Sequence, residues 1–384
     1  MSEAQRDFLF IQSTTEVGGA EAATLNLFTH SAELRARSVI ANLGYGQGDL
    51  PLRLRAAGAE VIDLPPTRLR NPIGASKMLL SLRRLARARG VRVVAANGAH
   101  PQVVGGVAAR LARVKSVFLV NMIHRLPLWS NEPLDMLALR GPCDLMLVIS
   151  RASMDTIERL RPGVESRLFY WGTPLRETPD ADARAARAEL GIADDEVLVG
   201  VFGRLQRWKA QDVFVEAAAR VAVSRPKSRF VVVGGSVFGL EPEYFEELKS
   251  GARARGLDGR LTFTGFRNDV ARLMAACDVV CHTSRVPEPF GLVVIEAMAQ
   301  ARPVIATRGG GPSEIFADDS QGLLVSPDDA AGLAAAITTL VDDPEKRRRM
   351  GIAGLARVKD AFTIDVMARN LIAHFDSVAG ARAA

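Results

Sequence analysis

Short apolar segments alternate with longer segments of helical period along the whole 384-residue chain. Apolar segments such as 229–233 have the length and β-branched composition of buried strands, and segments such as 210–222 repeat apolar residues at helical spacing. This alternation predicts parallel sheets with right-handed crossovers and helices on both faces. Two such series follow one another, so we expect an α/β fold with two doubly wound domains. The expected strands are 8–12, 38–43, 60–64, 91–95, 116–120, 144–149 and 167–170 in the first series, and 198–201, 229–233, 261–264, 279–282, 304–306 and 322–324 in the second.

A segment rich in proline and acidic residues, 173–183, interrupts the pattern and is the expected linker. The predicted domains are therefore 1–175 and 176–364, followed by a terminal segment, 365–384, that contains one helix. A chain of 384 residues has the right length for two domains of ordinary size.

Composition excludes several other classes of protein. Hydrophobic residues make up 48% and charged residues 24%, as in soluble globular proteins, and no apolar run approaches the roughly 20 residues that span a bilayer. The first seven residues carry acids and no apolar core, so we expect no signal peptide. The three cysteines (Cys143, Cys277 and Cys281) form no CxxC pair, which indicates reduced thiols in a cytoplasmic protein and no structural zinc.

The two halves of the chain differ in charge. Residues 1–175 hold 22 basic and 14 acidic side chains, and the remainder holds 27 basic and 29 acidic ones. A basic first half indicates an anionic partner such as a membrane surface or a phosphorylated acceptor, although arginine-rich helices also arise from genome composition alone. The segment 75–89 fits contact with an anionic membrane, but an ordinary crossover helix with a solvated basic face is favoured. Nucleic-acid binding is not expected, because aromatic residues make up only 6% of the chain and are not interleaved with basic ones.

The most specific motif is Glu288-Pro-Phe-Gly-Leu-Val-Val-Ile-Glu296, which follows the strand expected to end near His282. A helix is expected to begin near Phe290–Gly291, where its first amides lack intrahelical partners and form an anion site. Glu288 and Glu296 then accept hydrogen bonds from hydroxyls beside the bound phosphate, whereas the alternative is two surface glutamates on an exposed helix. The pattern fits a nucleotide diphospho-sugar. The amides of the predicted anion site belong to Phe290, Gly291, Leu292 and Val293.

A second motif, Gly203-Arg-Leu-Gln-Arg-Trp-Lys209, follows the first strand of the second domain. Arg204 and Lys209 are positioned to hold a diphosphate and to offset the charge that develops as it leaves. No acidic cage lies nearby in the sequence, so we expect cations rather than a metal ion to do this. A solvated basic loop is the alternative.

Three further features follow expected strands. Gly18-Gly19 permits a tight turn into a helix with free amides at its start. His124 lies where a histidine can hydrogen-bond a sugar hydroxyl, although a purely structural histidine is the alternative. Phe266, in the segment 264–267, is expected to line a base pocket through backbone groups.

Together these motifs resemble those of the retaining glycosyltransferases of family 4, which have the GT-B fold of two Rossmann-like domains that face each other across a cleft. The resemblance is strongest over 198–345. It implies that Glu288 and His124 lie at the donor sugar, that Glu296 binds the ribose, and that Arg204 and Lys209 bind the diphosphate. It also implies that Gly18 and Gly19 border the donor phosphates, that no metal is essential, and that the last helix crosses back onto the first domain. The segment His282-Thr283-Ser284 departs from the family, which commonly has Pro-Ser there.

The expected function is therefore retaining transfer of a sugar from a UDP- or GDP-linked donor, which is a substrate, with no separate cofactor. The acceptor hydroxyl would belong to a glycan, a lipid-linked glycan or a small molecule, in bacterial glycan or glycolipid assembly. The expected location is the cytoplasm, with peripheral contact at the inner face of the membrane left open. Two alternatives remain: a nucleotide-sugar epimerase or hydrolase of the same fold, and a non-catalytic nucleotide- or carbohydrate-binding scaffold.

Overall fold

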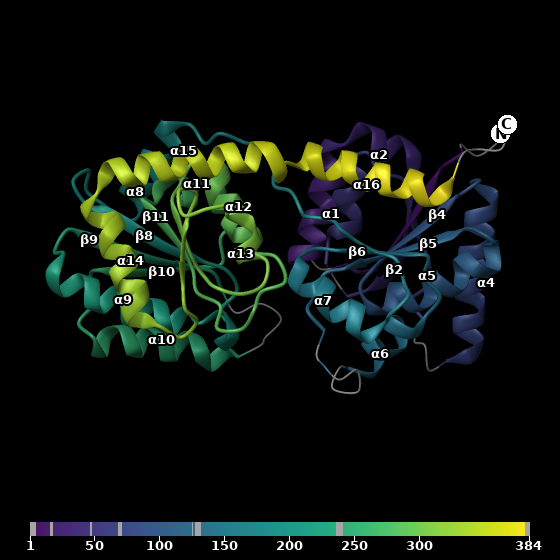
Figure 1. The fold of residues 1–384 in the computed structure, drawn as a ribbon, viewed down its shortest axis with the longest axis horizontal. Coiled ribbons are helices and arrows are strands. Elements are labelled where there is room, and N and C mark those ends of the chain that lie inside the picture. Colours follow the sequence, from purple (N-terminus) through teal and green to yellow (C-terminus); the bar gives the residue numbers. More distant parts are fainter. Residues whose placement is uncertain are drawn as a thin grey trace. The chain divides into compact units, whose positions relative to one another are not determined.

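The structure is a computed structural model that describes residues 5–15, 18–46, 48–67, 71–124, 126, 132–235 and 241–380. The chain divides into two compact units (Figure 1). Unit 1 comprises Met1–Pro174 and Thr363–Ala384, and unit 2 comprises Leu175–Phe362.

Unit 1 is built on a parallel sheet of seven strands in the order β3-β2-β1-β4-β5-β6-β7. Its central strands are buried over most or all of their length, as expected of apolar runs covered on both faces by helices. The strand order reverses between β1 and β4, and ligands of open α/β sheets bind at the carboxyl ends of strands beside such a switch point. The strands are β1 (Phe8–Thr14), β2 (Ser38–Tyr45), β3 (Val61–Asp63), β4 (Val93–Asn97), β5 (Lys115–Val120), β6 (Leu145–Val148) and β7 (Ser166–Leu168).

The last helix of the chain, α16 (Ile364–Ala379), belongs to unit 1 and runs beside α1 (Figure 1). The ring of Phe375 packs edge-on against Phe8 of β1 with 5.0 Å between centroids. Arg37 donates to both carboxylate oxygens of Asp376 on α16, at 3.0 and 2.5 Å. An aromatic contact thus attaches the C-terminal helix to β1, and an ion pair of two hydrogen bonds attaches it to Arg37 at the end of α2. The other helices of unit 1 are α1 (Gly19–His30), α2 (Ala32–Arg37), α3 (Leu50–Ala56), α4 (Pro72–Ala88), α5 (Ala99–Ala112), α6 (Pro133–Arg140) and α7 (Arg151–Leu160).

Unit 2 contains a parallel sheet of six strands in the order β10-β9-β8-β11-β12-β13. Here the order reverses between β8 and β11, so the carboxyl ends of these two neighbours define a second switch point. The strands are β8 (Val197–Phe202), β9 (Ser228–Val233), β10 (Leu261–Gly265), β11 (Val279–His282), β12 (Val304–Thr307) and β13 (Leu323–Val325).

Helices cover both faces of this sheet (Figure 1). On one face, α9, α10 and α14 bury a core with Phe214, Phe230 and Ile337. On the other, α8 lies beside α11, and α12 lies beside α15. The helical segments of unit 2 are α8 (Asp180–Glu189), the short 3-10 turn η2 (Arg207–Lys209), α9 (Gln211–Ser224), α10 (Pro242–Ala254), α11 (Val270–Ala276), α12 (Leu292–Ala299), α13 (Pro312–Ile315), α14 (Ala330–Asp342) and α15 (Pro344–Ala361).

The prediction of two doubly wound domains is confirmed, and every expected strand overlaps an observed one. Helix α8 begins at Asp180, within the segment 173–183 that the sequence indicates as the linker. The buried residues of α8 are alanines, Ala183 and Ala186, which give only a weak apolar period. Arg187 holds the helix in place by donating to Asp278 at 2.9 Å. Within the described ranges, no helix is long and apolar enough to cross a membrane.

Candidate functional site

A cavity of about 210 Å³ lies at the carboxyl ends of β8, β9 and β10 in unit 2. Its lining includes Arg204 and Phe266 from loops after two of these strands, and Val293 and Glu296 from α12. This is the edge of an open α/β sheet at which ligands bind. Four predicted site residues from three separate sequence segments, Arg204, Phe266, Val293 and Glu296, therefore share one cavity.

Glycines allow the loops behind this cavity to approach one another closely. Gly203 and Gly234 have φ values of +139° and +152°, where a side chain is strained. A Cβ atom on Gly234 would overlap the carbonyl oxygen of Gly203. The Gly203 amide donates to the Val233 carbonyl at 3.0 Å, and the Gly234 amide donates to the Gly265 carbonyl at 3.1 Å. The backbone segments that follow β8, β9 and β10 therefore pack directly against one another, and the cavity beside them stays open for a ligand.

Arg204 and Glu296 bring a cation and a carboxyl group to the cavity. Burial raises the pKa of Glu296 to about 7, because a carboxylate away from water is disfavoured. Within the described part of the chain, neither the Glu296 carboxyl nor the Arg204 guanidinium has a hydrogen bond or an ion pair to another side chain. Groups of this kind suit a ligand that supplies hydroxyls to the acid and an anion to the guanidinium.

A second cluster in unit 2 joins Lys209 to Glu288. The Lys209 Nζ and Glu288 Oε1 atoms lie 2.6 Å apart, and both side chains are only 14% exposed. The ammonium also sits 4.2 Å from the centre of the Trp208 ring. The Thr283 hydroxyl donates to the Lys209 carbonyl at 2.8 Å, which fixes the lysine backbone. The sequence predicts that Lys209 binds phosphate and that Glu288 binds hydroxyls. In the structure the two side chains form an ion pair with each other.

The other oxygen of Glu288 is also occupied. Oε2 lies 2.5 Å from His282 Nε2 and accepts a hydrogen bond from Ser284 Oγ at 2.9 Å. Burial raises the pKa of Glu288, but the fields of His282 and Lys209 outweigh it and hold the pKa well below its usual range. Glu288 is therefore an ionised carboxylate with both oxygens bound. His282 and Ser284 were not predicted as site residues, although their polarity at the end of an apolar strand was a usable signal.

The glycine-rich loop after β12 places the Glu288 backbone. Gly310, at φ +65°, forms a parallel bridge with Glu288, and the Gly311 amide donates to the Glu288 carbonyl at 2.8 Å. A Cβ atom on Gly310 would overlap that carbonyl oxygen. The backbone of the glycine-rich loop thus packs directly against the backbone of Glu288 and fixes its position.

Helix α12 begins at Leu292, slightly later than predicted, with Gly291 as its N-cap at φ +107°. Leu292 and Val293 occupy its first turn. The prediction that Phe290 belongs to the helix is wrong. Its ring is buried, 5.9 Å from the ring of Phe362. Burial of a large aromatic ring accounts for this placement, and it makes Phe290 an anchor of the loop.

The remaining predicted residues belong to unit 1. Gly18 is the N-cap of α1, and Gly19 is the first residue of that helix. The prediction of a glycine-dependent turn with free amides is wrong at Gly18, because its φ of −100° suits any residue and its amide donates to Glu21 Oε2 at 3.1 Å. His124 follows β5 and is 7% exposed.

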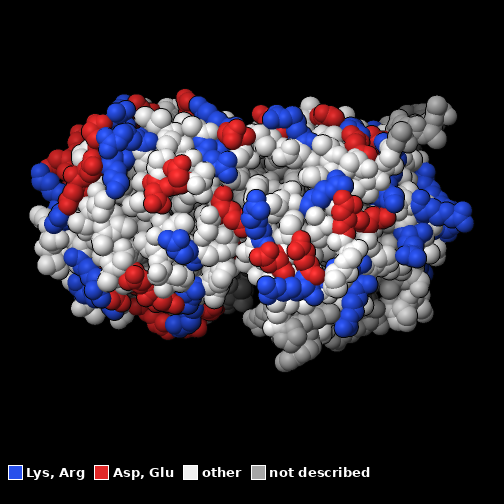
Figure 2. Space-filling model, in the orientation of Figure 1, with Lys and Arg blue, Asp and Glu red and all other residues white. Residues whose placement is uncertain are grey.

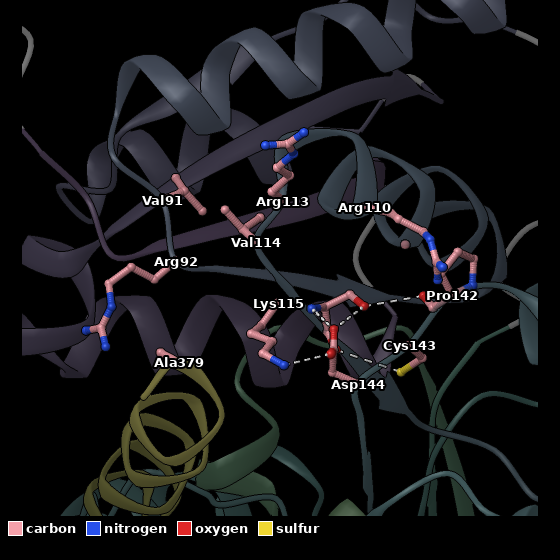
Figure 3. A pocket seen from close by; sticks show the side chains of 12 residues that line it. Val91, Arg92, Arg110, Arg113, Val114, Lys115, Pro142, Cys143, Asp144 and Ala379 are labelled. Atoms are coloured by element: carbon pink, nitrogen blue, oxygen red, sulfur yellow. Dashed lines mark hydrogen bonds and ion pairs between the residues drawn. The ribbon is translucent and has the colours of Figure 1, made fainter. Parts of the chain in front are cut away.

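A larger cavity, of about 520 Å³, lies at the opposite edge of the unit 1 sheet, where β4, β5 and β6 begin (Figure 3). Arg92, Arg110, Arg113 and Lys115 surround it, and Lys115 is paired with Asp144 at 3.1 Å. Ligands of this fold class bind at the other edge, so we do not include this cavity in the candidate site. In the described parts of both units, no three His, Cys, Asp or Glu side chains gather as metal ligands would.

Comparisons with known proteins agree with the fold and the motifs. Residues 182–357 match the model of the family described as glycosyl transferases group 1. The D-inositol 3-phosphate glycosyltransferase of Stackebrandtia nassauensis is 36% identical over 220 residues, which cover 55% of this chain and 47% of that protein. The lipopolysaccharide core biosynthesis mannosyltransferase LpsB of Rhizobium meliloti is 31% identical, over 53% of this chain and 58% of that one. The match thus spans about half the length of these curated relatives.

Among solved structures, Alr3699/HepE of Anabaena in complex with UDP-glucose superposes with a TM-score of 0.84 at 28% identity. The match covers 97% of this chain and 99% of that one. These similarities confirm the GT-B fold and the family resemblance that the motifs indicated.

Proposed function

We propose that the chain is a glycosyltransferase of group 1, the family whose model matches residues 182–357, and that it transfers a sugar from a nucleoside-diphosphate donor to a hydroxyl acceptor. The observation that carries the proposal is the cavity at the carboxyl edge of the unit 2 sheet, in which Arg204 and Glu296 have no side-chain partner among the residues that the structure describes. The guanidinium takes the diphosphate, and the acid takes the ribose hydroxyls. Phe266, which is 68% exposed beside this cavity, contacts the base.

The donor in this proposal is a UDP-linked sugar. Its support is the similarity to Alr3699/HepE, whose structures contain UDP and UDP-glucose. A GDP-linked donor is the alternative to be compared with it.

The chemistry we propose is substitution with retention of anomeric configuration. The acceptor oxygen bonds to the anomeric carbon as the bond from that carbon to the diphosphate oxygen breaks. The acceptor proton passes to the departing diphosphate. Arg204 and Lys209 offset the charge of the leaving group, so the reaction requires no metal ion.

Unit 1 binds the acceptor in this proposal, with His124 at the reacting sugar. Its helix α4 exposes Ile73 and Leu80 together with the cations Lys77, Arg84 and Arg87. Basic side chains gather at the α4 end of unit 1 (Figure 2). Apolar and cationic side chains on one helix suit contact with an anionic membrane and access to a lipid-linked acceptor. Binding to anionic but not neutral vesicles, lost when these three cations become glutamate, tests this contact.

The direct test is to incubate the protein with a panel of UDP- and GDP-sugars and acceptors, and to measure release of nucleoside diphosphate and the anomeric configuration of the product. Acceptor-dependent release with a retained product supports the proposal. Products formed without acceptor would indicate an epimerase or a hydrolase. Nucleotide binding without any product would indicate a scaffold.

A further inference from the structure

The segment that follows β11, residues 282–285, contacts both halves of the Lys209–Glu288 pair. Thr283 binds the backbone carbonyl of Lys209, and the Arg285 amide donates to the carbonyl of Trp208 at 2.9 Å. From the same segment, His282 and Ser284 bind the side chain of Glu288. One short stretch of chain therefore fixes where the cation and the acid meet.

The histidine is held on both edges of its ring. Its side chain is 5% exposed, and the partner at Nε2 is an ionised carboxylate, so Nε2 must carry a proton and donate it. The other nitrogen, Nδ1, lies 3.4 Å from Thr307 Oγ1 on β12, and that hydroxyl donates to the Ser284 carbonyl at 2.8 Å. The burial of the ring and the short contact at Nε2 keep its N–H toward Glu288.

Holding Glu288 in this way has a consequence for Lys209. An ammonium has three N–H donors, and Glu288 Oε1 takes one of them. Because Oε2 is bound by His282 and Ser284, the carboxylate cannot rotate away from the lysine without losing two hydrogen bonds. The remaining N–H groups of Lys209 then keep a fixed direction, as preorganised stabilisation of charge requires.

We propose that His282, assisted by Ser284, is a positioning residue that acts through Glu288 to aim Lys209 at the diphosphate of the donor. The inference rests on the proposed function for the identity of that ligand. No role of this kind follows from the motif itself, in which Pro-Ser is common at these positions. It follows from the side-chain contacts around Glu288.

The test uses the full chain and the variants His282→Ala and His282→Gln, because the glutamine amide restores an N–H donor where the histidine had Nε2. We expect His282→Ala to lower UDP affinity about tenfold and kcat/KM about 30-fold, as for the loss of a hydrogen bond to a charged group. His282→Gln should recover both to within about threefold. Ser228→Ala, which alters a buried serine of unit 2 whose hydroxyl has no hydrogen-bond partner within the described residues, is the control and should match the wild type.

A double-mutant cycle separates positioning from general support of the fold. In a Glu288→Gln background, His282→Ala should cause little further loss of UDP affinity. An equal loss in both backgrounds, or no loss in either, overturns the inference. Should His282→Ala fold poorly, Ser284→Ala removes one hydrogen bond to the same oxygen and should give a smaller loss that again depends on Glu288.

A measurement independent of ligands completes the test. In protein labelled with ¹⁵N-histidine, the Nε2–H proton of His282 should resonate far downfield and move upfield in Glu288→Gln. If the chemical shift of this proton is the same in Glu288→Gln as in the wild type, the contact between His282 and Glu288 is contradicted. If the contact and the UDP coupling hold but no sugar is transferred, the proposed function fails and the positioning role stands.

Discussion

Lys209 and Glu288 are separated by 79 residues in the sequence and form an ion pair of 2.6 Å in which both side chains are largely buried. Such a pair is stabilising only when its remaining hydrogen-bonding capacity is used, because each charge has left water. The structure meets this condition on the acid, whose second oxygen is bound by His282 and Ser284. Among the described residues, Glu288 Oε1 takes only one of the three N–H groups of Lys209. In our proposal the diphosphate of the donor binds the others.

Replacing Lys209 by alanine should lower kcat about 10²–10³-fold, because a fixed cation no longer offsets the charge of the leaving diphosphate. Steady-state release of UDP from a UDP-sugar measures this. Lys227→Ala is the matched control, since Lys227 of unit 2 pairs with Asp195 at 2.7 Å on the surface. Equal rates in the two variants would contradict the assignment of Lys209.

Gly310→Ala should destabilise unit 2 and reduce activity together. A side chain at φ +65° is strained by about 1–2 kcal/mol, and here its Cβ would also overlap the Glu288 carbonyl oxygen. Gly259→Ala separates the two effects, because Gly259 has φ +70° with nothing within 4 Å of the added Cβ. Urea unfolding should show a loss of only about 1–2 kcal/mol for Gly259→Ala and a clearly larger one for Gly310→Ala. Equal losses would mean that the loop can move away from Glu288.

The raised pKa of Glu296 predicts a pH-dependent stability. Folding raises this pKa from 4.5 to about 7, so between these pH values the folded chain keeps a proton that the unfolded chain has released. Stability therefore falls as pH rises through this window, by about 3 kcal/mol in total. Glu296→Gln removes the effect and should raise the melting temperature relative to wild type at pH 8 but not at pH 4. The same variant should bind UDP more weakly at both pH values. If Glu296→Gln raised the melting temperature equally at pH 4 and pH 8, the raised pKa of Glu296 would not explain the gain in stability.

Phe375→Ala should destabilise unit 1 by about 3–5 kcal/mol, as truncation of a buried aromatic side chain does. Phe375 is fully buried and contacts Phe8 and Phe10, with ring centroids at 5.0 and 5.7 Å. Hydrogen exchange resolved by segment measures the change in each unit. Faster exchange in β1 is expected, and Val223→Ala, at a position that is 89% exposed, should leave exchange unchanged.

Removal of divalent metal ions should not reduce transfer. The proposal assigns stabilisation of the leaving group to Arg204 and Lys209, so activity in excess EDTA should match that in added Mg²⁺ to within about twofold. A loss in EDTA that Mg²⁺ restores would require a metal-bound donor.

The fold was largely predictable because its signals are local. Apolar runs of strand length, helices of 3.6-residue period and left-handed glycines such as Gly203 and Gly291 each reflect the backbone around them. Helix α8 was missed in part because alanine contributes little to an apolar period, so its burial depends on the partner it packs against. The cap of α1 was misjudged for a related reason, since nothing in the Gly-Gly pair shows that Glu21 will bind the Gly18 amide.

The sequence by itself determined that strands and helices alternate, that glycines permit tight loops at the strand ends, and that acids and cations follow particular strands. Which acid faces which cation was decided only by tertiary structure. Strand order sets β8 beside β11, and this places the loop that carries Lys209 next to the residues that end the neighbouring strand and bind Glu288. A carboxylate has no intrinsic preference among cations in a sequence, because hydrogen bonds and strong ion pairs form only at the short distances that folding creates.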